Sequence, residues 1–114
     1  MASPLTTHIL DTANGVPAVG VPITLTRLNG EGVATILASG VTNRDGRVAD
    51  LVDPSRFGVG RYCIRFDIAA YFVALGTPSF FPWAEVVFDV TDASRHHHVP
   101  LLVSPFGFST YRGS

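Results

Sequence analysis

The most regular feature of this 114-residue chain is a period-two alternation of apolar and polar positions. It occurs in three segments, whose apolar positions are Val21, Ile23 and Leu25; Tyr62, Ile64, Phe66 and Ile68; and Ala84, Val86, Phe88 and Val90. Successive side chains of a β-strand point to opposite faces of the sheet, so the alternation predicts strands with one buried face. The pattern therefore favours an all-β protein.

Turn-forming residues separate these segments. Asn14-Gly15, Asn29-Gly30 and Asp45-Gly46 favour tight turns, and eight prolines are too many for a helical protein of this length. We expect one short helix, over residues 68–75, and Gly76 is placed to end it. The expected strands cover residues 6–11, 20–28, 32–39, 41–43, 60–68, 84–91, 96–103 and 106–111. Seven or eight short strands at this spacing predict a two-sheet β-sandwich, a single domain over residues 1–114.

Composition narrows the classes of function. Hydrophobic residues make up 46% of the chain and charged residues 15%, which suits a well-filled core. The net charge is −1, so we expect no nucleic acid and no membrane among its partners. The one cysteine, Cys63, cannot form an intramolecular disulfide, and no apolar run reaches the roughly 20 residues of a membrane span. Met1 to Thr7 lacks the features of a secretory signal, so we expect a cytoplasmic protein, with periplasm and peroxisome left open.

Four histidines are the most distinctive polar residues. His96 and His98 point to one face of an expected strand and His97 to the other, because strand side chains alternate. Neighbouring i and i+2 histidines can hold a metal ion, but no carboxylate or thiolate stands at ligand spacing nearby. His8 shares a strand face with Thr6, and on its own it is compatible with a structural hydrogen-bonding role.

The other candidate side chains also have ordinary interpretations. Arg47 follows a turn, where surface arginines are common, and Tyr111 alternates in a way that suits packing at a sheet edge. Cys63 lies on the polar face of its strand with no adjacent histidine, which argues against a nucleophile. The sequence contains no Gly-x-Ser-x-Gly elbow and no Gly-x-Gly-x-x-Gly loop. Periodicity and composition alone therefore name no reaction.

The C-terminal segment is more informative. Residues 96–114 read His-His-His-Val-Pro-Leu-Leu-Val-Ser-Pro-Phe-Gly-Phe-Ser-Thr-Tyr-Arg-Gly-Ser, which resembles the C-terminal signature of the 5-hydroxyisourate hydrolases. The terminal Tyr-Arg-Gly-Ser distinguishes that enzyme family from the hormone-carrying transthyretins. The segments 8–11, 15–18, 42–47 and 80–82 also match, so the resemblance covers essentially the whole chain.

The resemblance implies a transthyretin-like sandwich assembled as a homotetramer, a dimer of dimers with active sites in the clefts between dimers. It implies hydrolysis of the small molecule 5-hydroxyisourate to 2-oxo-4-hydroxy-4-carboxy-5-ureidoimidazoline in urate degradation, with no metal and no cofactor. Carried over residue by residue, the catalytic positions are His8, Arg47, His98 and Ser114, and the substrate-binding positions are His8, Arg47, Tyr111, Arg112 and Gly113.

The chain departs from the family pattern at three positions. His97 and Phe108 stand where the family usually has Tyr, and Phe106 stands where it often does. Because His97 lies on the strand face opposite His98, we expect it to change packing or an interface and leave the chemistry intact. The two phenylalanines lack any hydrogen bond that a tyrosine hydroxyl makes in relatives.

Two other functions stay open at this point. One is a non-enzymatic, transthyretin-like carrier of small aromatic ligands, and the other is a metal-binding sandwich that uses His96 and His98. A carrier channel lined with apolar side chains would not need His8, Arg47 and His98 together, so that combination favours the enzyme.

Overall fold

The computed structural model describes residues 3–31 and 33–114. Residue 32, where the sequence predicts a strand to begin, lies outside the described residues, as do residues 1 and 2. The elements are β1 (Leu5–Thr6), β2 (Ile9–Asp11), β3 (Val16–Pro17), β4 (Pro22–Leu28), β5 (Ala34–Val41), the 3₁₀ helix η1 (Pro54–Arg56), β6 (Gly60–Phe66), α1 (Ile68–Ala74), β7 (Ala84–Val90), β8 (His97–His98), β9 (Leu101–Ser104) and β10 (Gly107–Thr110).

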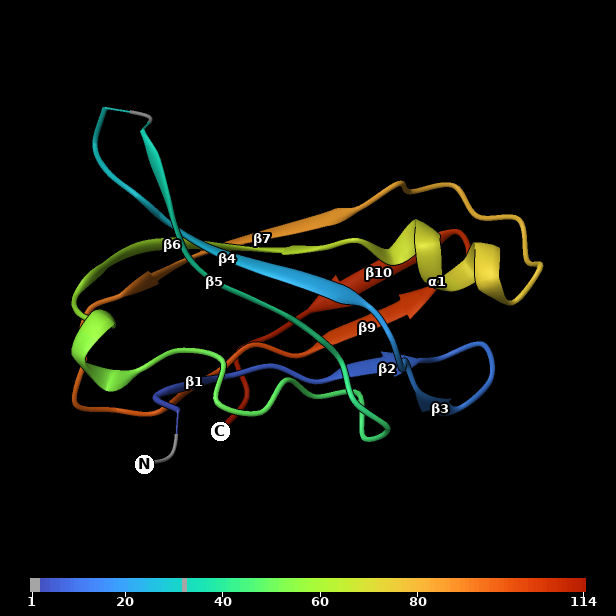
Figure 1. Cartoon of the computed structure of the whole chain (residues 1–114), viewed down its shortest axis with the longest axis horizontal. Coiled ribbons are helices and arrows are strands. Elements are labelled where there is room, and N and C mark those ends of the chain that lie inside the picture. The colour runs from blue at the N-terminus through green and yellow to red at the C-terminus, as the bar shows by residue number, and fades with distance from the viewer. Residues whose placement is uncertain (1–2, 32) are drawn as a thin grey trace.

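Two four-stranded sheets face each other, with strand orders β10-β9-β2-β3 and β5-β4-β6-β7 (Figure 1). The apolar positions of the alternating segments fill the space between them: Ile23, Leu25, Tyr62, Ile64 and Phe66 are all buried. Buried apolar area is the main source of folding free energy, so the alternation in sequence is what holds the sheets together. The predicted two-sheet sandwich is confirmed.

Both sheets leave an edge open on the same side of the sandwich. β7 and β10 are the end strands of their sheets, and residues 86–89 and 110–112 line one common hollow. Several large apolar side chains near these edges are exposed, namely Phe80, Val87, Phe106, Phe108 and Tyr111. An open edge carries unpaired N–H and C=O groups that can pair with another strand.

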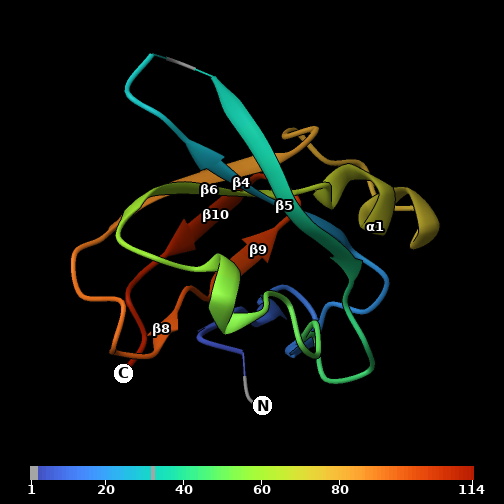
Figure 2. The same cartoon turned by 60° about the vertical axis from the view of Figure 1, so that its left-hand side comes forward.

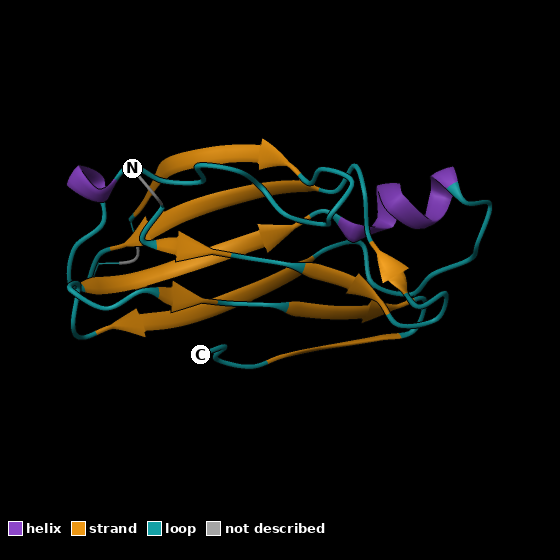
Figure 3. Ribbon diagram, turned by 90° about the horizontal axis from the view of Figure 1, so that it is seen from below, coloured by secondary structure: helices purple, strands orange, loops and turns teal. Residues whose placement is uncertain are grey.

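The predicted helix is present as α1, at the opposite end of the sandwich from η1 (Figure 3). Its C-terminus is capped by two bonds, Gly76 N to the Val73 carbonyl at 3.0 Å and Thr77 N to the Phe72 carbonyl at 2.9 Å. Gly76 has a φ of +68°, which a glycine adopts without steric cost, so the expected stop at this residue is confirmed. In the part of the chain that the structure describes, no helix is long and apolar enough to cross a bilayer.

A buried carboxylate ties the helix to the sheet. The Tyr71 hydroxyl donates to Asp11 Oδ2 at 2.7 Å, and Asp11 also accepts from Asn14 and from the amide of Ala13. These hydrogen bonds outweigh burial and hold the pKa of Asp11 below its usual value, whereas burial and the neighbouring carboxylate raise the pKa of Tyr71 to about 12. The helix is therefore fixed through a charged, fully satisfied group.

The described residues form ten strands where seven or eight were expected, because two predicted strands are each divided, two others join into one, and β3 was not predicted. The strand expected over 6–11 divides into β1 and β2, and that over 96–103 into β8 and β9. These segments run parallel, and the gap in both falls beside Pro100, which has no N–H for the ladder. The Thr7 hydroxyl bonds the Val99 carbonyl at 2.6 Å across this gap.

The strands expected over 32–39 and 41–43 are a single strand, β5. The prediction treated Gly40 as a break, but Gly40 pairs with Ile23 inside the ladder. A Cβ at residue 40 would lie 2.6 Å from Val48 Cγ1, so glycine is needed here for close packing and not for a turn. β3 and η1 were not predicted, because each is too short to show a period.

Candidate active site

Two parallel strand pairs bring the histidines of the two ends of the chain together. β1 pairs with β8, with Thr6 opposite His98, and β2 pairs with β9. His8 lies between β1 and β2, and its carbonyl accepts from Leu101 N at 2.9 Å. Alternation then puts Thr6, His8 and His98 on the same outer face of the sheet. Figure 2 shows β8 beside the C-terminal end of the chain.

A tight turn places Arg47 against His8. The Asn43 side-chain oxygen accepts from Arg47 N at 3.2 Å, and Gly46 N donates to the Asn43 carbonyl at 2.9 Å. The turn is fastened to the sheet, because Ile9 N donates to the Gly46 carbonyl at 2.9 Å and His8 forms a β-bridge with Arg47.

Only glycine fits at residue 46 of this turn. Its φ is +73°, and an added Cβ would lie 2.6 Å from the Ile9 carbonyl oxygen and 3.3 Å from His8 Cδ2. The Asp45-Gly46 pair seen in the sequence therefore serves to bring the backbone next to His8. It is Arg47, the next residue, that gains its position from this contact.

The C-terminal segment packs directly on His98. Gly113 N donates to the His98 carbonyl at 2.8 Å, and the two residues form an antiparallel bridge. An added Cβ at Gly113 would lie 3.0 Å from His98 Cγ and closer still to Cδ2, so glycine permits this approach. Tyr111, Arg112 and Ser114 are exposed around it. Residues from four separate parts of the sequence thus share one face.

The charges on this face favour neutral histidines. Burial lowers the pKa of His98 below its usual 6.5, and the nearby charges of Arg47, His8 and His96 lower it further. Burial and then Arg47 also lower the pKa of His8, although Asp45 acts in the opposite direction. In residues 3–31 and 33–114, the Arg47 guanidinium has no carboxylate within ion-pair distance, so its donors are available to a ligand.

Thr6 contacts two histidines, a role that the sequence analysis did not assign. Its hydroxyl oxygen lies 2.7 Å from His98 Nδ1 and 2.8 Å from His96 Nε2. The sequence did contain one indication of this role. Thr6 and His8 are two residues apart and so share a strand face, and the same holds for His96 and His98. A threonine in a strand is so common that this signal alone does not single it out.

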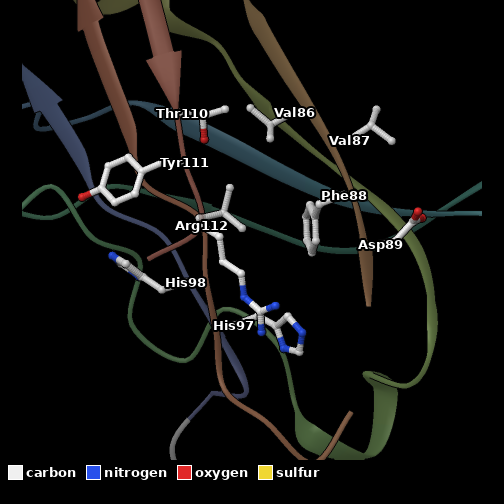
Figure 4. A pocket seen from close by; sticks show the side chains of 10 residues that line it. Val86, Val87, Phe88, Asp89, His97, His98, Thr110, Tyr111 and Arg112 are labelled. Atoms are coloured by element: carbon white, nitrogen blue, oxygen red, sulfur yellow. The ribbon is translucent and has the colours of Figure 1, made fainter. Parts of the chain in front are cut away.

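His97 and His98 point to opposite sides of their strand (Figure 4). His97 is buried, and its ring packs edge-on against Phe57 with centroids 5.8 Å apart, so it is a packing residue. A hollow of about 230 Å³ lies beside it, lined by Val86, Val87, Phe88, Asp89, His97, His98, Val99, Thr110, Tyr111 and Arg112. His8 and Arg47 stand outside this hollow, on the open face.

Metal and thiol chemistry find little support. Among the described residues, no group of three or more His, Cys, Asp or Glu side chains is arranged to hold a metal ion. His96 and His98 each direct a ring nitrogen to Thr6. Burial, and then Glu85, raises the pKa of the Cys63 thiol, which opposes the thiolate that a nucleophile needs.

The arrangement has the groups needed for hydrolysis of a polar carbonyl compound. Two half-buried imidazoles, each with its pKa lowered first by burial and then by Arg47, are neutral bases that can take a proton and return it. A free guanidinium beside them offers planar donors to a carbonyl oxygen as it gains negative charge.

Comparisons with known proteins point to one family. A model of the HIUase/Transthyretin family matches residues 5–113. The chain is 46% identical to "5-hydroxyisourate hydrolase" of Mus musculus, over 99% of this chain and 97% of that protein. It superposes on the structure of Klebsiella pneumoniae 5-hydroxyisourate hydrolase with a TM-score of 0.82 and 42% identity, over 96% of this chain and 98% of the other. Sea bream transthyretin, solved in complex with thyroxine, gives a TM-score of 0.92 with 36% identity, over 96% and 94% of the two chains.

Proposed function

The chain belongs to the HIUase/Transthyretin family, and we propose that it is an enzyme that hydrolyses 5-hydroxyisourate in urate degradation. The observation that carries the proposal is the meeting of His8, Arg47 and His98 on one sheet face, with Gly113 packed on His98. The Klebsiella pneumoniae hydrolase and the thyroxine-bound sea bream transthyretin share this fold, so the fold alone does not distinguish an enzyme from a carrier. Three polar groups on one face favour the enzyme.

The reaction is the hydrolysis of a cyclic amide. The oxygen of water bonds to the ring carbonyl carbon, the carbon–nitrogen bond of the ring breaks, and the leaving nitrogen takes a proton. His98 and His8 carry the proton transfers: a neutral histidine takes the proton of water, and the imidazolium so formed supplies the proton that the leaving nitrogen takes. The lowered pKa of each histidine keeps a neutral, basic form available at neutral pH.

Arg47 and the C-terminal residues bind the substrate and its developing charge. The Arg47 guanidinium donates to the attacked carbonyl oxygen, which becomes negative in the transition state. Tyr111 and Arg112 contact the purine-derived ring, and Ser114 contributes its hydroxyl to the reacting end. Gly113 lets this segment approach the ring of His98 closely.

We further propose that the protein forms a homotetramer, a dimer of dimers. The open edges of β7 and β10, with the exposed apolar side chains beside them, would extend both sheets across a dimer interface. The site supports the second interface, because Arg47, Tyr111 and Ser114 are exposed on one protomer and need a facing surface to exclude water. The mass in solution, measured by light scattering, tests this: a monomer at micromolar concentration would contradict it.

The compartment that we propose is the cytoplasm. Its support is the single cysteine, Cys63, which is free and buried, as is usual for proteins of reducing compartments.

The test of function is the ultraviolet decay of freshly generated 5-hydroxyisourate. The wild-type protein should accelerate the decay, whereas His98→Ala and Arg47→Ala should each lower kcat/KM by about 10²–10⁴-fold, the loss of one acid–base or oxyanion contact. Circular dichroism checks that both variants stay folded. No acceleration by the wild type, combined with saturable binding of a small aromatic ligand, would identify a carrier instead.

A further inference from the structure

The contact between Thr6 and two histidines constrains where their protons lie. A hydroxyl group has a single hydrogen, so Thr6 can donate to one imidazole and must accept from the other. Its oxygen lies at hydrogen-bond distance from both His98 Nδ1, at 2.7 Å, and His96 Nε2, at 2.8 Å. The three side chains therefore have two fully hydrogen-bonded arrangements.

The two arrangements leave His98 with opposite chemical properties. In the first, His98 Nδ1–H donates to the Thr6 oxygen and the Thr6 hydroxyl donates to His96, so His98 Nε2 carries a free lone pair and is a base. In the second, His96 Nε2–H donates to Thr6 and the Thr6 hydroxyl donates to His98 Nδ1, so His98 Nε2 carries the proton. A neutral histidine is a base only at the nitrogen without the proton.

We propose that Thr6 and His96 are positioning residues that set the tautomer of His98, and that the arrangement with the proton on His98 Nδ1 is the one that activates water. This inference rests on the proposed function, in which His98 transfers protons. Thr6 and His96 act through His98 and touch neither the attacking water nor the substrate.

The position of Thr6 allows it to set the tautomer of His98. Its place opposite His98 is fixed by the parallel pairing of β1 with β8, and Val99 N donates to its carbonyl at 2.9 Å. On the other side of the ring, Gly113 packs against His98. Held between the Thr6 hydroxyl and the Gly113 backbone, the His98 ring keeps Nδ1 on Thr6 and leaves Nε2 as the nitrogen available to a ligand.

Other charged groups act on His98 without setting its tautomer. Arg47 and His8 face it from the neighbouring turn and strand, and His96 faces it along its own segment; all three disfavour the charged form. Of these groups, only His96 is joined to His98 through a single shared hydroxyl. Changes at Thr6 should therefore alter the tautomer, whereas the charge of Arg47 alters the affinity for a proton.

The test uses Thr6→Val, which replaces the hydroxyl with a methyl group of similar size and keeps a β-branched side chain in the strand. Long-range ¹H–¹⁵N spectra of the full-length protein report which nitrogen of His98 is protonated, and they need no substrate. We expect Thr6→Val to shift the His98 tautomer away from Nδ1–H and to lower kcat by about 10- to 100-fold with KM unchanged, as for the loss of a partner that orients a functional histidine. Thr6→Ser should restore both properties.

A matched control is Thr35→Val, the same change on an exposed position of β5 in the opposite sheet. It should leave the tautomer and the turnover as in the wild type. His96→Glu, which can only accept from Thr6 when ionised, should keep Nδ1–H on His98, and His96→Lys, which can only donate, should move the proton to Nε2.

These measurements test the control of the tautomer independently of the proposed enzyme activity. An unchanged His98 tautomer in Thr6→Val overturns the proposal that Thr6 sets it, whatever the turnover. A changed tautomer with unchanged kcat overturns its part in catalysis. If the wild type does not hydrolyse 5-hydroxyisourate, the proposed function fails, while the spectra still decide whether Thr6 sets the tautomer.

Discussion

The close approach of Gly113 to His98 provides a sharp test of the site. We consider Gly113→Ala, the smallest possible change at a residue that has no polar side chain to lose. The new Cβ would lie 3.0 Å from His98 Cγ, 3.1 Å from its Cβ and nearer still to Cδ2. Carbon atoms in contact stay about 3.5–4.0 Å apart, so the ring and the C-terminal strand must separate by roughly 1 Å.

In the proposed mechanism this displacement acts on His98, one of the groups that transfer protons. A shift of roughly 1 Å in a catalytic group costs about 10²-fold in rate, so kcat/KM should fall by about that factor. The stability cost is small, because at most one backbone hydrogen bond, Gly113 N to the His98 carbonyl, is lost, at about 0.5–1.5 kcal/mol. A protein of this size is typically stable by about 5–15 kcal/mol, so the variant should remain folded.

The assay is the same ultraviolet decay, with thermal unfolding followed by circular dichroism. Gly107→Ala is the control, since a Cβ there would meet only Ser104 Oγ, at an ordinary 3.7 Å. It should behave as the wild type. Wild-type turnover in a folded Gly113→Ala protein would refute the argument that this contact positions His98, and an equal loss in both variants would trace the effect to the strand as a whole.

Three further predictions follow from the structure. The lowered pKa values of His8 and His98 should place the acid limb of the kcat/KM–pH profile below pH 6.5, because the basic forms persist to lower pH; a limb above 6.5 would contradict this. Tyr71→Phe should destabilise the fold by about 1.5–3 kcal/mol at neutral pH in urea unfolding, through the hydrogen bond lost to Asp11. Because the pKa of Asp11 is lowered on folding, its contribution to the free energy of unfolding is present above its unfolded pKa and is lost as pH falls through the folded value. The wild type and Tyr71→Phe should therefore become equally stable in acid. Exhaustive chelation should leave turnover unchanged, and a loss restored by zinc would support the metal site instead.

The sequence predicted those parts of the fold that depend on local pattern. Tyr62, Ile64 and Phe66 alternate and are buried, and Gly76 ends the helix, because both features follow from periodicity and backbone freedom. The interruption beside Pro100 and the place of Gly40 inside a strand were missed. Each depends on which segment lies alongside, and local sequence does not contain that information.

The candidate site divides in the same way. His8, Arg47 and His98 were chosen through resemblance, since each is ordinary as a single residue. Thr6 was not chosen, because its importance comes only from the register that sets it opposite His98. Pairing between segments about 90 residues apart creates the site, and a period of two within one strand cannot reveal its partner.

The parallel pairing of the two ends of the chain also has a consequence for biosynthesis. β1 and β2 can pair with β8 and β9 only after residue 104 has left the ribosome, and the bridge to His98 must wait for Gly113. Folds dominated by such distant contacts form slowly, and their early strands stay unpaired meanwhile. A translation product that stops before residue 97 would therefore leave β1 and β2 without their partners β8 and β9 and would lack both His98 and Gly113, so such a chain is exposed to chaperones and proteases.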